Sequence, residues 1–180
     1  PKSVEHFKNR PFRIFSAGRM SAEKGHIYLV RAFKEVCRQS DKELELHLVG
    51  DGPERHRLEK EANELSIADK VHFHGYINRG PELFKMIEQS QLFIMPSLTE
   101  GMGRGMIEVI VQGIPVIGSN VDGIPEYLPN EALFEAGNPH SMAEKILDII
   151  DKPEKLAAMS LRNYEAGKAF RPEALKTVKQ

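Results

Sequence analysis

Patterns typical of strands and of helices alternate along nearly the whole chain and are joined by short loops. The strand patterns cover residues 12–17, 44–49, 71–74, 92–95, 115–118 and 132–134. The helical patterns cover residues 27–38, 54–65, 81–89, 106–112, 142–150 and 153–167, and 172–180 is either a shorter helix or a frayed tail. This alternation predicts one α/β domain, a Rossmann-like, doubly wound and mostly parallel sheet with helices on both faces.

The composition excludes several classes of protein. Apolar residues make up 41% of the 180 residues, which is enough for an ordinary globular core. The 25 basic and 26 acidic residues leave a net charge of −1, so nucleic acid is not an expected partner. The single cysteine, Cys37, excludes an internal disulfide and a cysteine zinc cluster. No apolar run approaches the ~20 residues that span a bilayer.

The chain begins at Pro1, without an initiator methionine or a signal-peptide pattern. We therefore interpret it as a segment of a longer protein and expect a cytoplasmic location. Any contact with the inner face of the membrane is expected through the part of the protein outside this chain.

The loop after the first predicted strand carries two cations. In doubly wound sheets the ligand lies at the carboxyl ends of the strands, so this loop is a candidate binding element. Gly18 lets the chain turn, and Arg19 and Lys24 then stand beside the start of the next helix. Two cations near free helix N–H groups suit a diphosphate. An ordinary solvated loop is an equally good interpretation at this point.

The loop at 97–105 follows the continuously apolar strand at 92–95 and opens a helix. Its three alternating glycines allow backbone amides to approach a ligand closely, although their spacing is not the dinucleotide-binding fingerprint. Glu100 lies in the loop and Glu108 about one turn into the helix, so both carboxylates can face one cleft. The alternatives are a cap residue and a charge on the helix surface. Burying Glu108 would be costly without a polar partner.

The remaining polar features are less specific. Asp51, in the loop at 50–53, is most simply a helix cap, and the loop at 118–126 either walls a pocket or crosses the sheet edge. His72 and His74 share one face of a strand but have no third ligand nearby in sequence, so we interpret them as strand residues rather than a metal site. No Asp-x-Asp triplet occurs, which removes the usual metal anchor for a nucleotide diphosphate.

Four of these segments occur in the order known from one enzyme family. They are Gly18-Arg19-x4-Lys24-Gly25, LHLVGDGPERHRLE at 46–59, VHFHGYI at 71–77, and Glu100-x7-Glu108 within TEGMGRGMIEVIVQGIPVIGSNVDGIPEYL at 99–128. Together they resemble the C-terminal, donor-binding half of GT-B glycosyltransferases of the glycosyl transferases group 1, or family 4, type. The resemblance spans about residues 12–150, which is most of the chain.

The resemblance implies roles for individual residues. Arg19 and Lys24 would hold the donor diphosphate and neutralise the charge that grows as it leaves, in place of a metal ion. Glu100 would contact the hydroxyls of the transferred sugar, and Glu108 the ribose hydroxyls. The other residues implied to contact the donor are Gly18, Met102, Gly103 and Arg104. The segment His72–Tyr76, with His74, would border the base through its main chain. Many family members have Phe or Pro and then an aliphatic residue after Glu-Gly, so Arg104 either adds a third cation or points into solvent.

The resemblance also implies a reaction and a partner. The donor would be a UDP-, GDP- or ADP-linked sugar, transferred with retention and without a metal or other cofactor to a glycan or lipid-linked acceptor. An N-terminal GT-B domain, absent from this chain, would supply the acceptor site, so the chain alone is expected to show little or no transferase activity. The alternatives are a GT-B sugar-nucleotide epimerase and a non-catalytic nucleotide- or phosphate-binding module of doubly wound type.

Overall fold

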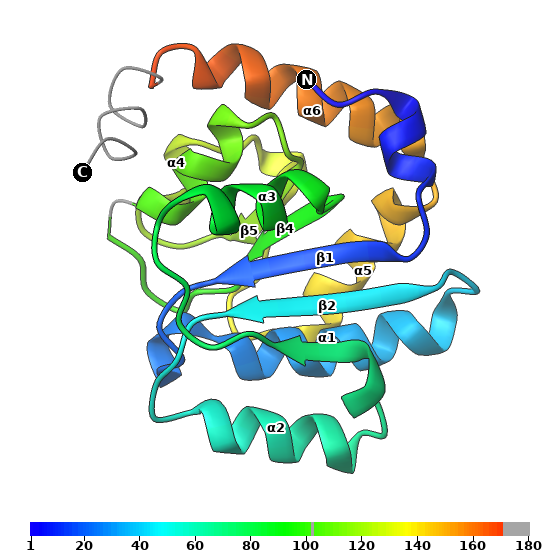
Figure 1. Cartoon of the computed structure of the whole chain (residues 1–180), viewed down its shortest axis with the longest axis vertical. Coiled ribbons are helices and arrows are strands. Elements are labelled where there is room, and N and C mark those ends of the chain that lie inside the picture. The colour runs from blue at the N-terminus through cyan, green and yellow to red at the C-terminus, as the bar shows by residue number, and fades with distance from the viewer. Residues whose placement is uncertain (102, 171–180) are drawn as a thin grey trace.

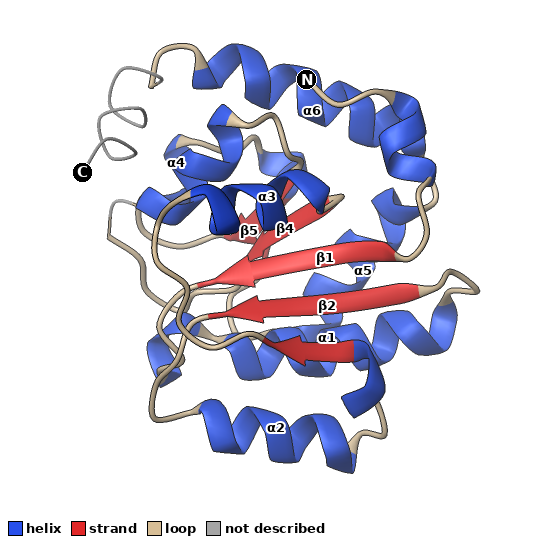
Figure 2. Cartoon of the chain, in the orientation of Figure 1, coloured by secondary structure: helices blue, strands red, loops and turns tan. Residues whose placement is uncertain are grey.

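In the computed structural model, which describes residues 1–101 and 103–170, six strands form one sheet in the order β3-β2-β1-β4-β5-β6 (Figure 2). The strands are β1 (Phe12–Ala17), β2 (Leu44–Val49), β3 (Val71–Phe73), β4 (Leu92–Met95), β5 (Val116–Ser119) and β6 (Leu133–Phe134). Every neighbouring pair is parallel. The predicted doubly wound parallel sheet is thus confirmed.

Helices cover both faces of this sheet. They are α1 (His26–Gln39), α2 (Arg55–Glu64), α3 (Pro81–Gln89), α4 (Arg104–Val111), α5 (Pro139–Ile150) and α6 (Pro153–Gly167). Figure 1 shows α1 and α5 behind the strands, with α3 and α4 in front and α6 packed against α4. The predicted helix or tail at 172–180 lies outside the described residues.

Two helices, α4 and α5, begin two and three residues earlier than the periodicity predicts, because local caps set their starts. Gly103 adopts a left-handed conformation (φ +55°) as the N-cap of α4, so the helix begins at Arg104 rather than at residue 106. In α5 the side chain of Asn138 accepts a hydrogen bond from the amide of Ser141, and the helix begins at Pro139 rather than at residue 142. Cap geometry of this kind is independent of the apolar pattern.

The central strands are buried on both faces, whereas β2 is buried on one. All four residues of β4 and of β5 are buried. In β2 the leucines at 44, 46 and 48 are buried, while Glu45 and His47 alternate with them and stay partly accessible. Burying one such apolar side chain contributes about 1.5–3 kcal/mol, so the central strands form a rigid base under the loops at their carboxyl ends.

The chain reverses its direction of winding between β1 and β4, which are neighbours in the sheet. This is the point at which parallel α/β sheets open a crevice. Backbone hydrogen bonds join the loops at this edge: Gly18 N to Val49 O (3.0 Å), Gly50 N to Gly75 O (2.8 Å) and Leu98 N to Glu23 O (2.8 Å). The loops after β1, β2, β3 and β4 therefore form one connected layer.

Gly25 lies where the loops after β1 and β4 meet. Its φ of +68° is left-handed, and a Cβ added there would lie 2.0 Å from the carbonyl oxygen of Pro96. Only glycine fits this contact without moving the backbone.

We predict that Gly25→Ala lowers the free energy of unfolding by about 2 kcal/mol or more, because the left-handed conformation costs an L-residue roughly 1–2 kcal/mol and the clash adds to it. Chemical denaturation measures this loss. Gly80→Ala is the matched control, because Gly80 is extended and a Cβ there meets nothing within 4 Å. An equal effect of the two substitutions would contradict the loop contact.

Candidate functional site

A cavity of about 780 Å³ lies at the carboxyl ends of β1, β2 and β4. Residues of α3 and α4 also line it. Most of the residues predicted to form a site line it. They are Gly18, Arg19, Lys24, Glu100, Gly103, Arg104 and Glu108. The structure thus brings together, in one place, residues from the loop after β1 and residues from the loop and helix after β4.

Two predicted residues stand apart from this group. His74 does not line the cavity, and its Nε2 instead lies 2.9 Å from Nδ1 of His47. The cavity is lined in that region by Tyr76 and Ile77, because the chain turns toward it only after β3 has ended. Met102 lies outside the described residues.

Lys24 and Glu100 form an ion pair across the boundary between β1 and β4, with Nζ 2.9 Å from Oε2. The same carboxylate oxygen accepts a hydrogen bond from the Ser97 hydroxyl at 3.0 Å, and the Glu100 amide donates to Oδ2 of Asp122 at 2.8 Å. The two paired side chains are only 28% and 11% exposed, so solvent screens their attraction incompletely. The loop at 118–126 therefore holds the candidate site loop in place.

The two arginines of this set differ from Lys24. Arg19 and Arg104 are both exposed at the margin of the cavity, and within the described part of the chain neither makes an ion pair. Their guanidinium groups can therefore turn to an incoming anion without breaking an ion pair of the described residues.

Glu108 has the polar partner that its burial requires. Its side chain is 13% exposed and its Oε1 lies 2.8 Å from the Arg79 guanidinium. Burial raises the pKa of the Glu108 carboxyl, and the Arg79 charge opposes that shift. Sequence reasoning missed Arg79, because the residue precedes the Gly80-Pro81 start of α3 and has no motif of its own.

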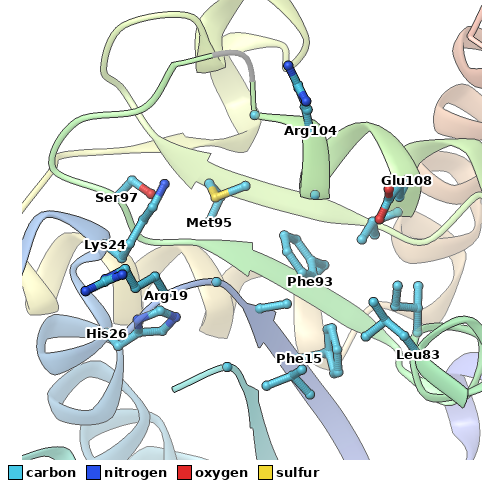
Figure 3. A pocket seen from close by; sticks show the side chains of 18 of the residues that line it. Phe15, Arg19, Lys24, His26, Leu83, Phe93, Met95, Ser97, Arg104 and Glu108 are labelled. Atoms are coloured by element: carbon cyan, nitrogen blue, oxygen red, sulfur yellow. The ribbon is translucent and has the colours of Figure 1, made fainter. Parts of the chain in front are cut away.

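The cavity has a polar end on each side of an apolar floor. Figure 3 shows Arg19 and Lys24 at one end and Glu108 at the other, with Phe93 between them. The rings of Phe15 and Phe93, whose centroids are 5.8 Å apart, form part of this floor. The first end thus holds Arg19 and the Lys24–Glu100 pair, and the other end holds Glu108 with Arg79.

His26 also lines the cavity, and its polar side chain is buried. It is 3% exposed, and its Nδ1 has no hydrogen-bond partner among the described residues. Burial, with a smaller contribution from the Lys24 charge, lowers the pKa of His26 to about 4. The imidazole is therefore neutral at pH 7 and adds no positive charge beside Lys24.

Residues 2–166 match the family model described as glycosyl transferases group 1. The chain belongs to this family.

Curated proteins similar to this chain are longer than the chain itself. An uncharacterized glycosyltransferase of Haemophilus influenzae is 30% identical over 151 residues, covering 82% of this chain and 42% of the relative. The lipopolysaccharide core biosynthesis glycosyltransferase LpsD of Rhizobium meliloti is 31% identical over 153 residues, with the same two shares. The chain thus spans about two fifths of the length of these relatives.

Solved structures agree with the fold. HepE of Anabaena, solved in complex with UDP, aligns with a TM-score of 0.79 at 20% identity, over 93% of this chain and 51% of that one. At such low identity the likeness shows the shared GT-B fold alone. None of the helices in the described residues is both long enough and apolar enough to cross a membrane.

The low pKa of His26 makes the stability of this domain pH-dependent. The unfolded chain takes up a proton near pH 6.5, whereas the folded chain does so only near pH 4, so stability falls as the pH drops through that window. Between pH 7 and pH 5 we predict a loss of about 2 kcal/mol through His26. Urea unfolding at both pH values measures it.

The His26→Gln variant should lose less stability than the wild type over that interval. His56→Gln, at an exposed position of α2, is the control and should behave like the wild type. Equal pH dependence of wild type and His26→Gln would show that His26 is not a buried neutral imidazole.

Proposed function

We propose that this chain is the donor-binding domain of a glycosyltransferase that uses a nucleotide-diphosphate sugar, without a metal ion and with retention of anomeric configuration. One observation carries the proposal. Arg19 and Lys24, from the loop after β1, and Glu108, from the helix after β4, line the same cavity at opposite ends. That arrangement matches a ligand with a diphosphate at one end and ribose hydroxyls at the other.

In this proposal the cationic end binds the diphosphate. The Lys24 ammonium is partly buried and held by Glu100, so its position is set before the donor arrives. Arg19 supplies a second, mobile charge, and α4 begins beside them at the Gly103 cap with its unpaired N–H groups. These groups would stabilise the negative charge that develops on the leaving diphosphate, as a metal ion does in other transferases.

Arg104 is the first residue of α4 and lies at the cavity margin. We assign it a third contact with the phosphates. Many family members have Phe or Pro and then an aliphatic residue after Glu-Gly, so this contact would be a departure from the family pattern.

The acidic end would bind the nucleoside. Arg79 lies 2.8 Å from Oε1 of Glu108, and none of the described residues donates a hydrogen bond to Oε2. The ribose hydroxyls would donate to this second oxygen, while the Arg79 charge opposes the rise in the pKa of this carboxyl that burial causes. Tyr76 is 76% exposed at the cavity margin and offers a ring to the base.

Glu100 would contact the transferred sugar. Its carboxylate is fixed by Lys24 and Ser97 and its backbone by Asp122, so it is a rigid acceptor next to the phosphate-binding end. The relatives' names as glycosyltransferases support a sugar donor, and the UDP bound to HepE makes UDP the first nucleotide to test. An acceptor domain would come from outside this chain, and we expect the chain alone to transfer little or no sugar.

Calorimetric titration with UDP, GDP and ADP in EDTA tests the phosphate-binding end. At least one nucleotide should bind, and Arg19→Ala and Lys24→Ala should each weaken it about tenfold or more, since a charge-assisted hydrogen bond contributes about 1.5–3 kcal/mol. Lys60→Ala, an exposed lysine of α2, is the control. A folded wild type that binds none of the three contradicts the proposal.

The acidic end is tested with a second ligand. Glu108→Gln should weaken the nucleotide about tenfold or more but leave the affinity for inorganic diphosphate nearly unchanged, because diphosphate carries no ribose. The exposed Glu64→Gln is the control. If Glu108→Gln weakened both ligands equally, the assignment of Glu108 to the ribose would be wrong.

A further inference from the structure

Three histidines and a glutamate gather on the accessible face of the sheet edge formed by β2 and β3. Glu45 and His47 lie on β2, opposite to its buried leucines, and His72 pairs in register with His47. The rings of His47 and His72 stack at 4.7 Å between centroids, and those of His47 and His74 at 5.1 Å. None of these four residues lines the cavity of the candidate functional site.

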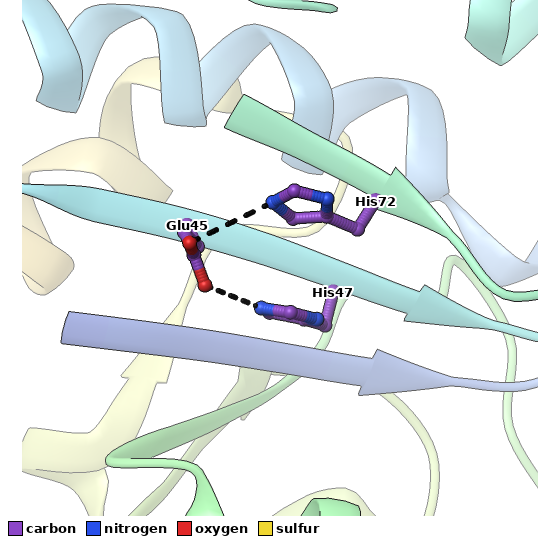
Figure 4. Close-up of side chains that lie close together, drawn as sticks. All are labelled: Glu45, His47 and His72. Carbon is purple, nitrogen blue, oxygen red and sulfur yellow. Dashed lines mark hydrogen bonds and ion pairs between the residues drawn. The ribbon is translucent and has the colours of Figure 1, made fainter. Parts of the chain in front are cut away.

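The potential ligand atoms of this cluster converge. One ligand atom each from Glu45, His47 and His72 lies within 4.8 Å of the other two. Figure 4 shows both imidazoles directed at the Glu45 carboxylate, with His47 Nε2 2.9 Å from Oε2 and His72 Nε2 3.9 Å from Oε1. Two ligands of a tetrahedral zinc ion are separated by about 3.4 Å, so each of the two nitrogen-to-carboxylate distances needs to change by about 0.5 Å.

The His72 ring supplies an independent observation. Its Nε2 is shielded from solvent and has no hydrogen-bond partner among the described residues. Leaving such an atom unpaired costs about 1–3 kcal/mol, whereas coordination would satisfy it. The atom faces the Glu45 carboxylate, where an ion shared with His47 would lie.

We propose that Glu45, His47 and His72 bind a divalent transition-metal ion of the zinc type. Imidazole nitrogen and carboxylate oxygen are the ligands that zinc accepts, and a water molecule would complete four-fold coordination. The ion would join β2 to β3, which is a short edge strand that leads into the cavity-lining Tyr76 and Ile77. This proposal does not depend on the proposed function.

Two residues beside the three proposed ligands, His74 and Arg13, would have opposite effects on metal affinity. His74 Nε2 lies 2.9 Å from His47 Nδ1, so it can accept a hydrogen bond from the Nδ1–H group that remains when Nε2 coordinates a metal. Arg13 Nε donates to Glu45 Oε2 at 3.3 Å, and its charge opposes a cation at this carboxylate. Removing the two side chains should therefore change metal affinity in opposite directions.

Calorimetric titration of Zn²⁺ into the untagged chain, after treatment with a chelator, tests the proposal. The wild type should bind one equivalent at a single site. Glu45→Gln and His72→Ala should weaken that site about tenfold or more, and His74→Ala should weaken it less. Arg13→Gln should tighten it. His56→Ala, on α2, is the control and should bind as the wild type does.

A second readout covers variants that lose stability. Zn²⁺ should raise the melting temperature of the wild type and of Arg13→Gln, and should raise that of Glu45→Gln much less, since only binding to the folded state stabilises it. Glu45→Gln keeps the shape of a partly exposed side chain, so its folding is expected to survive. No saturable Zn²⁺ binding by the wild type, or equal binding by Glu45→Gln and His56→Ala, overturns the proposal.

Discussion

The site depends on the divergence of the chain at two adjacent parallel strands. Next to each other in the sheet, β1 and β4 send their following segments to opposite faces, and the contact of Gly25 with Pro96 keeps the two loops together at the point of divergence. A cavity remains between them, with lining residues from both sides. The positions of Lys24 and Glu100 follow from this arrangement, and their ion pair bridges it.

Each end of the cavity carries an ion pair. Lys24, from the loop after β1, pairs with Glu100, and Glu108 of α4 pairs with Arg79 on the α3 side. The buried imidazole of His26 lines the cavity but is neutral at pH 7, because its pKa is about 4.

Much of this arrangement is predictable from the sequence. The periodicity predicts all six strands with small errors at their ends, and the position of Arg19, Lys24, Glu100 and Glu108 after parallel strands predicts that they meet. Partners brought in by register or by separate loops are not predictable in this way. The pairing of Glu100 with Asp122 and the approach of His47 to His72 join residues more than 20 positions apart and follow from sheet order. His74 was predicted beside the base, but it precedes the turn that carries Tyr76 into the cavity.

The most direct measurement is a crystal structure of this chain with UDP bound in the absence of divalent cations. We predict the diphosphate within hydrogen-bond distance of Arg19 and Lys24, and the ribose hydroxyls at the Glu108 carboxylate. UDP bound at the separate pocket beside β6, which is lined by Asn120 and Glu144, would contradict the assignment. So would a reversed pose with the phosphates at Glu108.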